Sequence, residues 1–160
     1  MKIGIFPGSF DPITIGHVDL LERAIAVFDE VILAIGQNSQ KKYLFSLDQR
    51  KAWLEDIAAK YDSVSVGVYE GLTVNFAKKK NAKYLIRGLR NASDFDYEKT
   101  ISQLNNIIGD GLETVFFIAQ PGLSHISSTI VREIIKGRGD VSSFVPDLIY
   151  EDIIQEYYSK

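Results

Sequence analysis

Short apolar runs alternate with helical patterns along this chain, and this alternation restricts the possible folds more than any other sequence feature. Five runs have the length of strands, and most are apolar almost throughout, as in strands covered on both faces. Because a helix separates consecutive runs, the strands are expected to be parallel, with right-handed crossovers. We therefore predict an α/β fold, a five-stranded parallel sheet with helices on both faces. The predicted strands are Lys2–Phe6, Glu30–Ile35, Ser63–Tyr69, Lys83–Ile86 and Glu113–Ala119.

Apolar residues at three- and four-residue offsets predict the helices between these strands. The helix expected from Asp94 is predicted to bury Phe95, Ile101, Leu104 and Ile108. Helices are predicted at His17–Phe28, Ser46–Tyr61, Thr73–Lys80, Asp94–Ile108, Ser127–Lys136 and from Pro146 onward.

The bulk composition limits the class of protein. At 160 residues the chain has the length of one domain, residues 1–160. It has no cysteine, which excludes disulfides and thiolate chemistry and fits a reducing cytoplasm. A net charge of −3 argues against a nucleic-acid partner. No stretch approaches the roughly 20 apolar residues of a membrane span. We expect a cytoplasmic protein with neither a nucleic-acid nor a membrane partner.

Cationic and hydroxyl side chains directly follow several of the predicted strands. In parallel sheets, ligands bind outside the carboxyl ends of the strands. At these ends the chain places the loop Pro7–His17, then Lys41, then Arg87 and Arg90, and finally Ser124–Thr129. A chain that is acidic in total thus gathers basic and hydroxyl groups at one edge of its sheet, which indicates a site for an anionic ligand such as phosphate.

The loop after the first strand contains Gly8, Ser9 and Gly16 and ends at His17. Strand, loop and helix in this order can hold phosphate on backbone N–H groups and a helix N-terminus. The loop has neither the Gly-Lys-Ser/Thr of a Walker A loop nor a G-x-G-x-x-G pattern. The glycines are equally well explained as turn residues. His17 at the carboxyl edge of the sheet favours a functional role, whereas His125 by itself indicates none.

The remaining candidates differ in strength. Arg87 and Arg90, separated by Gly-Leu, can direct two guanidinium groups at one anion, and arginine suits bidentate phosphate recognition. Lys41 has only its position to distinguish it from a solvated lysine. Glu98 fits either a charge near a helix start or a group facing the pocket. No acidic cluster has metal-ligand spacing, so a divalent ion would be carried mainly by substrate phosphates.

Two segments resemble the signatures of the nucleotidyltransferase superfamily. Phe6–His17, FPGSFDPITIGH, is similar to the T/H-x-G-H signature, and Ile126–Arg132, ISSTIVR, to I-S-S-T/S-x-x-R/K. With Lys41-Lys42, IRGLR at residues 86–90 and the acidic segment 94–98, nearly the whole chain resembles the bacterial phosphopantetheine adenylyltransferase family. The resemblance implies a Rossmann-like nucleotide-binding fold, a homohexamer, and Mg²⁺ accompanying ATP.

The family reaction joins ATP and 4′-phosphopantetheine to give dephospho-CoA and pyrophosphate, by direct in-line attack without a covalent enzyme intermediate. By this resemblance His17, Lys41 and Arg90 are catalytic. The acceptor is expected to contact Ser9, Lys41, Thr73 and Arg87. ATP is expected to contact Ser9, Phe10, His17, Gly88, Leu89, Arg90, Glu98, Leu123, Ser124, His125, Ile126, Ser127, Ser128 and Thr129.

Two departures from the superfamily pattern narrow the prediction. Thr14 stands where many members have histidine, which fits the phosphopantetheine branch. Leu123 stands where relatives often have an aromatic residue near the adenine, so base packing would rest on an aliphatic side chain. Two alternatives remain open from the sequence: a sibling enzyme that uses CTP or nicotinamide mononucleotide, and a non-catalytic nucleotide-binding domain.

Overall fold

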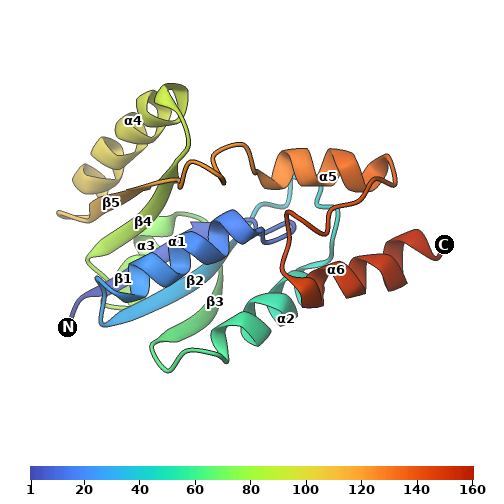
Figure 1. Ribbon diagram of the computed structural model, residues 1–160. Coiled ribbons are helices and arrows are strands. Elements are labelled where there is room, and N and C mark those ends of the chain that lie inside the picture. The colour runs from blue at the N-terminus through green and yellow to red at the C-terminus, as the bar shows by residue number, and fades with distance from the viewer.

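A parallel sheet of five strands forms the centre of the computed structural model, which describes residues 1–160 (Figure 1). The strand order is β3-β2-β1-β4-β5. The chain therefore builds outward from β1 to β3 and then returns to the other side of β1, so the order reverses between β1 and β4. In such sheets this reversal opens a crevice at the carboxyl ends of the strands. The strands are β1 (Ile3–Gly8), β2 (Glu30–Gln37), β3 (Val64–Glu70), β4 (Tyr84–Leu89) and β5 (Glu113–Ile118).

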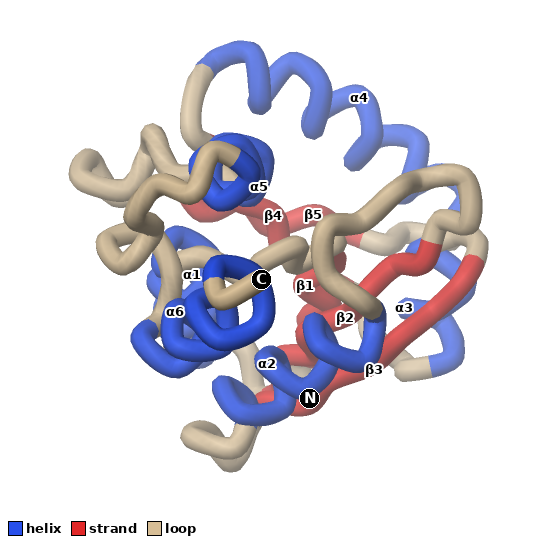
Figure 2. The backbone as a smooth tube through the Cα atoms, turned by 90° about the vertical axis from the view of Figure 1, so that its right-hand side faces the viewer, coloured by secondary structure: helices blue, strands red, loops and turns tan.

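Helices lie on both faces of the sheet, as predicted (Figure 2). Alternation along β1 divides the core, because Ile3 and Ile5 belong to one buried cluster and Phe6 to the other. Helices α3 (Thr73–Lys79) and α4 (Ala92–Ile108) lie on the Ile5 side. Helices α1 (Ile15–Ile25) and α2 (Leu47–Ala58) cover the Phe6 side, and α5 (Ser128–Lys136) and α6 (Asp147–Ile153) extend that layer past the ends of the strands (Figure 1). A π-helical turn, Ile154–Tyr158, continues α6.

The prediction for the buried side of α4 was wrong. Phe95, Leu104 and Ile108 are 45%, 52% and 54% exposed, and the one buried residue of this helix is Glu98. Spacing identifies an apolar stripe but does not show what covers it, and here the stripe faces outward. Ile101 is half-buried beside a pocket. At 17 residues α4 is the longest helix, and none of the helices is long and apolar enough to cross a membrane.

Candidate active site

Two adjoining pockets open at the carboxyl ends of β1 and β4. The larger, about 330 Å³, lies between the first loop, α1, β4 and the start of α5, and we call it the motif pocket. The smaller, about 280 Å³, is walled by α4 and the start of α3, and we call it the α4 pocket. Five residues line both pockets and form their common boundary: Pro7, Gly8, Ser9, Arg87 and Glu98.

The start of α1 explains the spacing of the T-x-G-H segment. Thr14 is the N-cap, and its Oγ1 accepts the backbone N–H of His17 at 3.3 Å. In return, Nδ1 of His17 accepts the backbone N–H of Thr14 at 3.0 Å. This reciprocal pair is a capping box in which histidine takes the usual place of Glu or Gln. Because Nδ1 is an acceptor, the proton of a neutral ring is on Nε2.

The surroundings of His17 keep its ring neutral. The ring packs against Phe10, with centroids 5.1 Å apart, and near Phe6. Burial, together with the positive charges of Arg87 and Arg90, lowers the pKa of His17 from 6.5 to about 4. At neutral pH His17 therefore offers the motif pocket an uncharged Nε2–H donor. Phe10 is only 2% exposed, and its ring is buried in this contact with His17.

Arg87 lines both pockets and lies at their boundary. Its Nε and Nη2 donate to the two carboxylate oxygens of Glu98 at 3.0 and 2.6 Å. Its Nη1 donates to the carbonyl oxygen of Pro7 at 2.9 Å. These bonds use three of the five guanidinium N–H groups and fix the plane of the group, so the remaining two can reach an anion at the boundary.

Lys41 and Arg90 add two further cations to the motif pocket. The Lys41 ammonium group donates to Ser9 Oγ at 3.0 Å, so these two predicted residues are in contact. Arg90 Nε donates to Asp94 at 3.2 Å. Both cations line the motif pocket together with Gly88 and Leu89. The pocket therefore has several positive groups near the His17 donor.

The start of α5 closes the motif pocket. Ser127 is its N-cap, and its Oγ accepts the N–H of Ile130 at 3.2 Å. Ser128 Oγ donates to the carbonyl oxygen of Pro12 at 2.8 Å, and Thr129 Oγ1 accepts a bond from Arg132. Ser128 therefore joins the start of α5 to the first loop. The first N–H groups of a helix have no backbone partner within it, and because Ser127 takes that of Ile130, those of Ser128 and Thr129 remain for an anion.

Sequence comparison supports the interpretation of this geometry. The cytidylyltransferase-like family model matches residues 5–134. A phosphopantetheine adenylyltransferase of Cytophaga hutchinsonii is 52% identical over 145 residues, 91% of this chain and 97% of that protein. One from Lachnoclostridium phytofermentans is 45% identical over 160 residues, 100% of this chain and 98% of that protein. The chain belongs to the phosphopantetheine adenylyltransferase family.

A solved structure extends the likeness at the level of fold. The Plasmodium falciparum nicotinic acid mononucleotide adenylyltransferase complexed with NaAD superposes with a TM-score of 0.69 at 17% identity, covering 98% of this chain and 95% of that one. The Rossmann-like fold and the enzyme class, a nucleotidyltransferase, are confirmed by these comparisons.

Most of the predicted site residues lie around the two pockets. Leu123, Ile126 and residues 127–129 line the motif pocket, whereas Thr73 lines the α4 pocket. Ser124 and His125 belong to the same turn but do not line either pocket: Ser124 bonds to the carbonyl of Pro121, and His125 packs edge-on to Phe144. Their contact with ATP stays a prediction.

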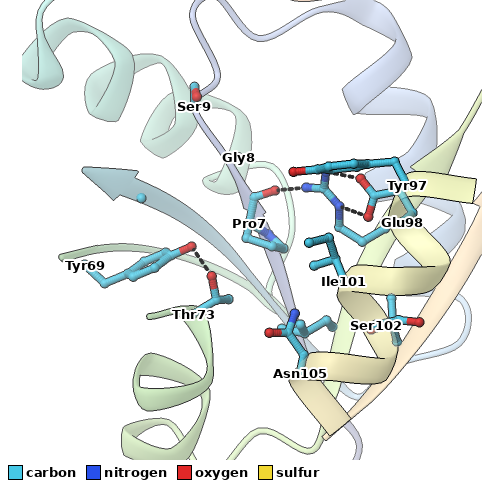
Figure 3. Close-up of a pocket in the computed structure, with 14 residues that line it drawn as sticks. Pro7, Gly8, Ser9, Tyr69, Thr73, Tyr97, Glu98, Ile101, Ser102 and Asn105 are labelled. Carbon is cyan, nitrogen blue, oxygen red and sulfur yellow. Dashed lines mark hydrogen bonds and ion pairs between the residues drawn. The ribbon is translucent and has the colours of Figure 1, made fainter. Parts of the chain in front are cut away.

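The sequence did not predict several side chains that line the α4 pocket. Tyr97, Ile101 and Asn105 line it from α4, and Tyr69 lies on the opposite wall, where its hydroxyl group shares a hydrogen bond of 2.8 Å with that of Thr73 (Figure 3). Glu98, Ile101 and Asn105 are three and four positions apart, so they share one side of the helix. Polar residues at this spacing are a sequence signal for a helix side that faces a pocket.

Proposed function

We propose that this member of the family transfers the adenylyl group of ATP to 4′-phosphopantetheine, giving dephospho-CoA and pyrophosphate. The observation that supports it best is the shared boundary of the two pockets at Ser9 and Arg87. When the pantetheine chain of the acceptor lies in the α4 pocket, its phosphate lies at this boundary and faces the α-phosphate of a nucleotide in the motif pocket. Positioning two reactants in this way supplies much of the rate enhancement of a transfer reaction.

The attacking group is a phosphate oxygen of the acceptor. A phosphomonoester has a second pKa of about 6 and is mostly a dianion at neutral pH, so it needs no general base. The oxygen forms a bond to the α-phosphorus of ATP while the bond from that phosphorus to the oxygen bridging to the β-phosphate breaks. The electron pair of the broken bond leaves with pyrophosphate, and no bond to the protein forms.

The protein acts on the charge that develops during this transfer. The Nε2–H of His17 donates to the α-phosphate, and Lys41 and Arg90 offset the negative charge as the reacting groups approach. Because Thr14 holds Nδ1, the donor is in place before the substrates arrive. Donors fixed in advance at the site of developing charge are among the largest contributions to catalysis.

We further propose that Mg²⁺ enters with ATP and neutralises charge on its phosphates. Each acidic side chain that lines the motif pocket is engaged by an arginine: Asp19 by Arg23, Asp94 by Arg90 and Glu98 by Arg87. No group of three metal-ligating side chains is present. This donor set fits an ion held chiefly by phosphate oxygens.

The assay that tests the reaction measures pyrophosphate release from ATP and Mg²⁺ with separate acceptors. We expect release with 4′-phosphopantetheine and none with nicotinamide mononucleotide; CTP in place of ATP is expected to be inactive. Release with nicotinamide mononucleotide alone, or with CTP in place of ATP, would reassign the enzyme to a sibling activity. Binding of ATP without release with any acceptor would support a non-catalytic nucleotide-binding domain.

We also propose that the chain assembles as a homohexamer in the cytoplasm, where ATP is available. The support for assembly is the exposed apolar side of α4, where Leu104 is 52%, Ile107 76% and Ile108 54% exposed. Faces of this kind mark interaction surfaces, and the number six comes from the family resemblance. Light scattering is expected to give six times the chain mass of 18.0 kDa, and Ile107→Glu a smaller species. A single-chain mass for the unmodified protein would refute assembly.

A further inference from the structure

A buried carboxylate outside both pockets connects the segment of Lys41 to the first loop. Asp11 is 1% exposed and lines neither pocket. Its Oδ2 accepts the backbone N–H of Leu44 at 2.8 Å, and its Oδ1 accepts that of Phe45 at 2.9 Å. Burying a carboxylate is unfavourable unless its oxygens are well paired. Here both oxygens are paired with the chain that follows Lys41.

A buried arginine makes a second connection between the same two segments. Arg50, from α2, is 3% exposed. Its Nε donates to the carbonyl oxygen of Phe45 at 3.1 Å, and its Nη1 to that of Ser9 at 2.8 Å. Its guanidinium lies 4.0 Å from the ring centroid of Tyr43. Burial lowers the pKa of Arg50, and the negative charge of Asp11 opposes this shift.

The first loop is fixed in turn to α5. Arg132 donates from Nη1 to the carbonyl oxygen of Asp11 at 2.8 Å. Asp11 therefore joins three segments: the first loop through its own backbone, the Lys41 segment through its carboxylate, and α5 through Arg132. The contact between Lys41 Nζ and Ser9 Oγ, at 3.0 Å, lies at the pocket end of this arrangement.

Apart from Ser9, the Lys41 ammonium group lies near the ring of Tyr43, 5.5 Å from its centroid. The residues from Asn38 to Lys42 are exposed, and a lysine side chain has a flexible four-carbon stem. We propose that Asp11 and Arg50 form a clamp that holds Lys41 beside Ser9, which makes them positioning residues for the acceptor phosphate. This inference rests on the proposed function of Lys41 in acceptor binding. The clamp acts on geometry and touches neither substrate.

The first test is Asp11→Asn, which keeps the shape of the side chain but presents an NH₂ group to one of two N–H donors. Hydrogen bonds to a charged group are strong enough that their loss is expected to speed amide exchange at Leu44 or Phe45 by about 10-fold or more. Amides of β2 should not change. Unchanged exchange at both Leu44 and Phe45 would overturn the clamp. Arg50→Lys, which keeps the charge but not the planar fork, provides the same test if Asp11→Asn does not fold.

The second test separates positioning from general destabilisation. Asp11→Asn is expected to lower kcat/KM for 4′-phosphopantetheine about 10-fold, but to have little further effect in a Lys41→Met background. Coupling of this kind identifies residues that act through one another. A matched control is Tyr61→Phe, which removes a hydrogen bond from the phenol O–H to Glu22 at a residue that lines neither pocket, and should leave kcat/KM unchanged.

Additive losses from Asp11→Asn and Lys41→Met would overturn the inference, because Asp11 would then act independently of Lys41. An unchanged kcat/KM for Lys41→Met alone would refute the proposed function of Lys41 and with it the purpose of the clamp. That failure is distinguished from failure of the clamp itself by the exchange rates of Leu44 and Phe45.

Discussion

Replacing His17 with glutamine should make the stability of the protein less sensitive to mild acid. In the wild type, the pKa of His17 is lowered from 6.5 to about 4 by burial and by Arg87 and Arg90. Glutamine does not titrate. It is also a usual residue at the third position of a capping box, so Thr14 keeps a partner for its backbone N–H. The substitution therefore removes the titration and preserves the helix start.

The sign and size follow from proton linkage. Above pH 6.5 the ring is neutral in the folded and unfolded chains, and it contributes no pH dependence. Between pH 6.5 and 4 the unfolded chain binds a proton that the folded chain does not, so stability falls as the pH falls. With pKa values of 6.5 and about 4, this costs about 2 kcal/mol between pH 7 and pH 5.

Urea unfolding at pH 7, 6 and 5 measures this difference. The only tryptophan, Trp53, is 1% exposed and gives a fluorescence signal for loss of the core. The carboxylates titrate in both proteins, so they cancel when the two are compared at equal protein concentration. We expect the wild type to lose about 2 kcal/mol more than His17→Gln between pH 7 and pH 5. Parallel curves for the two proteins would show that His17 is not held neutral by the fold.

Three further substitutions test other parts of the site. Thr14→Val removes the N-cap acceptor and should cost about 1 kcal/mol in urea unfolding, with Thr14→Ser as the control that retains it. Glu98→Gln leaves Arg87 without its ionised partner and should raise the KM for 4′-phosphopantetheine several-fold; an unchanged KM would show that Glu98 does not orient Arg87. Gly88→Ala places a Cβ 2.7 Å from Leu20 Cδ1, which should cost about 1–3 kcal/mol and raise the KM for ATP, whereas wild-type values would show that the Leu20 side chain moves aside freely.

The sequence was sufficient to predict where the site lies. Parallel strands bring their carboxyl ends to one edge, so Lys41, Arg87 and the Ser127 segment had to gather there once the strands were identified. Local signals also placed the start of α5 correctly, because Ser127 satisfies backbone N–H groups whatever the rest of the fold does.

Other features depended on contacts that no local pattern encodes. Arg87 can pair with Glu98 only when β4 and α4 pack in the register that brings these two residues together, and that register is set by tertiary packing. The ring of His17 was expected to stabilise charge, but its neutral state follows from Phe10 packing against it. The outward stripe of α4 was mistaken for core because periodicity gives no information about the surface that covers a helix.

The α4 helix contributes both to a ligand pocket and to an exposed apolar surface, so ligand binding and chain association can affect one another. Ile101 and Asn105 form part of the wall of the α4 pocket, and Leu104 and Ile108, three and seven positions after Ile101, are exposed next to them on the helix surface. A partner chain that packed on these exposed residues and a ligand that bound in the adjoining pocket would both act on the position of one helix. Their free energies are then linked, so the ligand strengthens the packing by the same factor by which the packing strengthens ligand binding. Dilution and substrate depletion would thus loosen the same element.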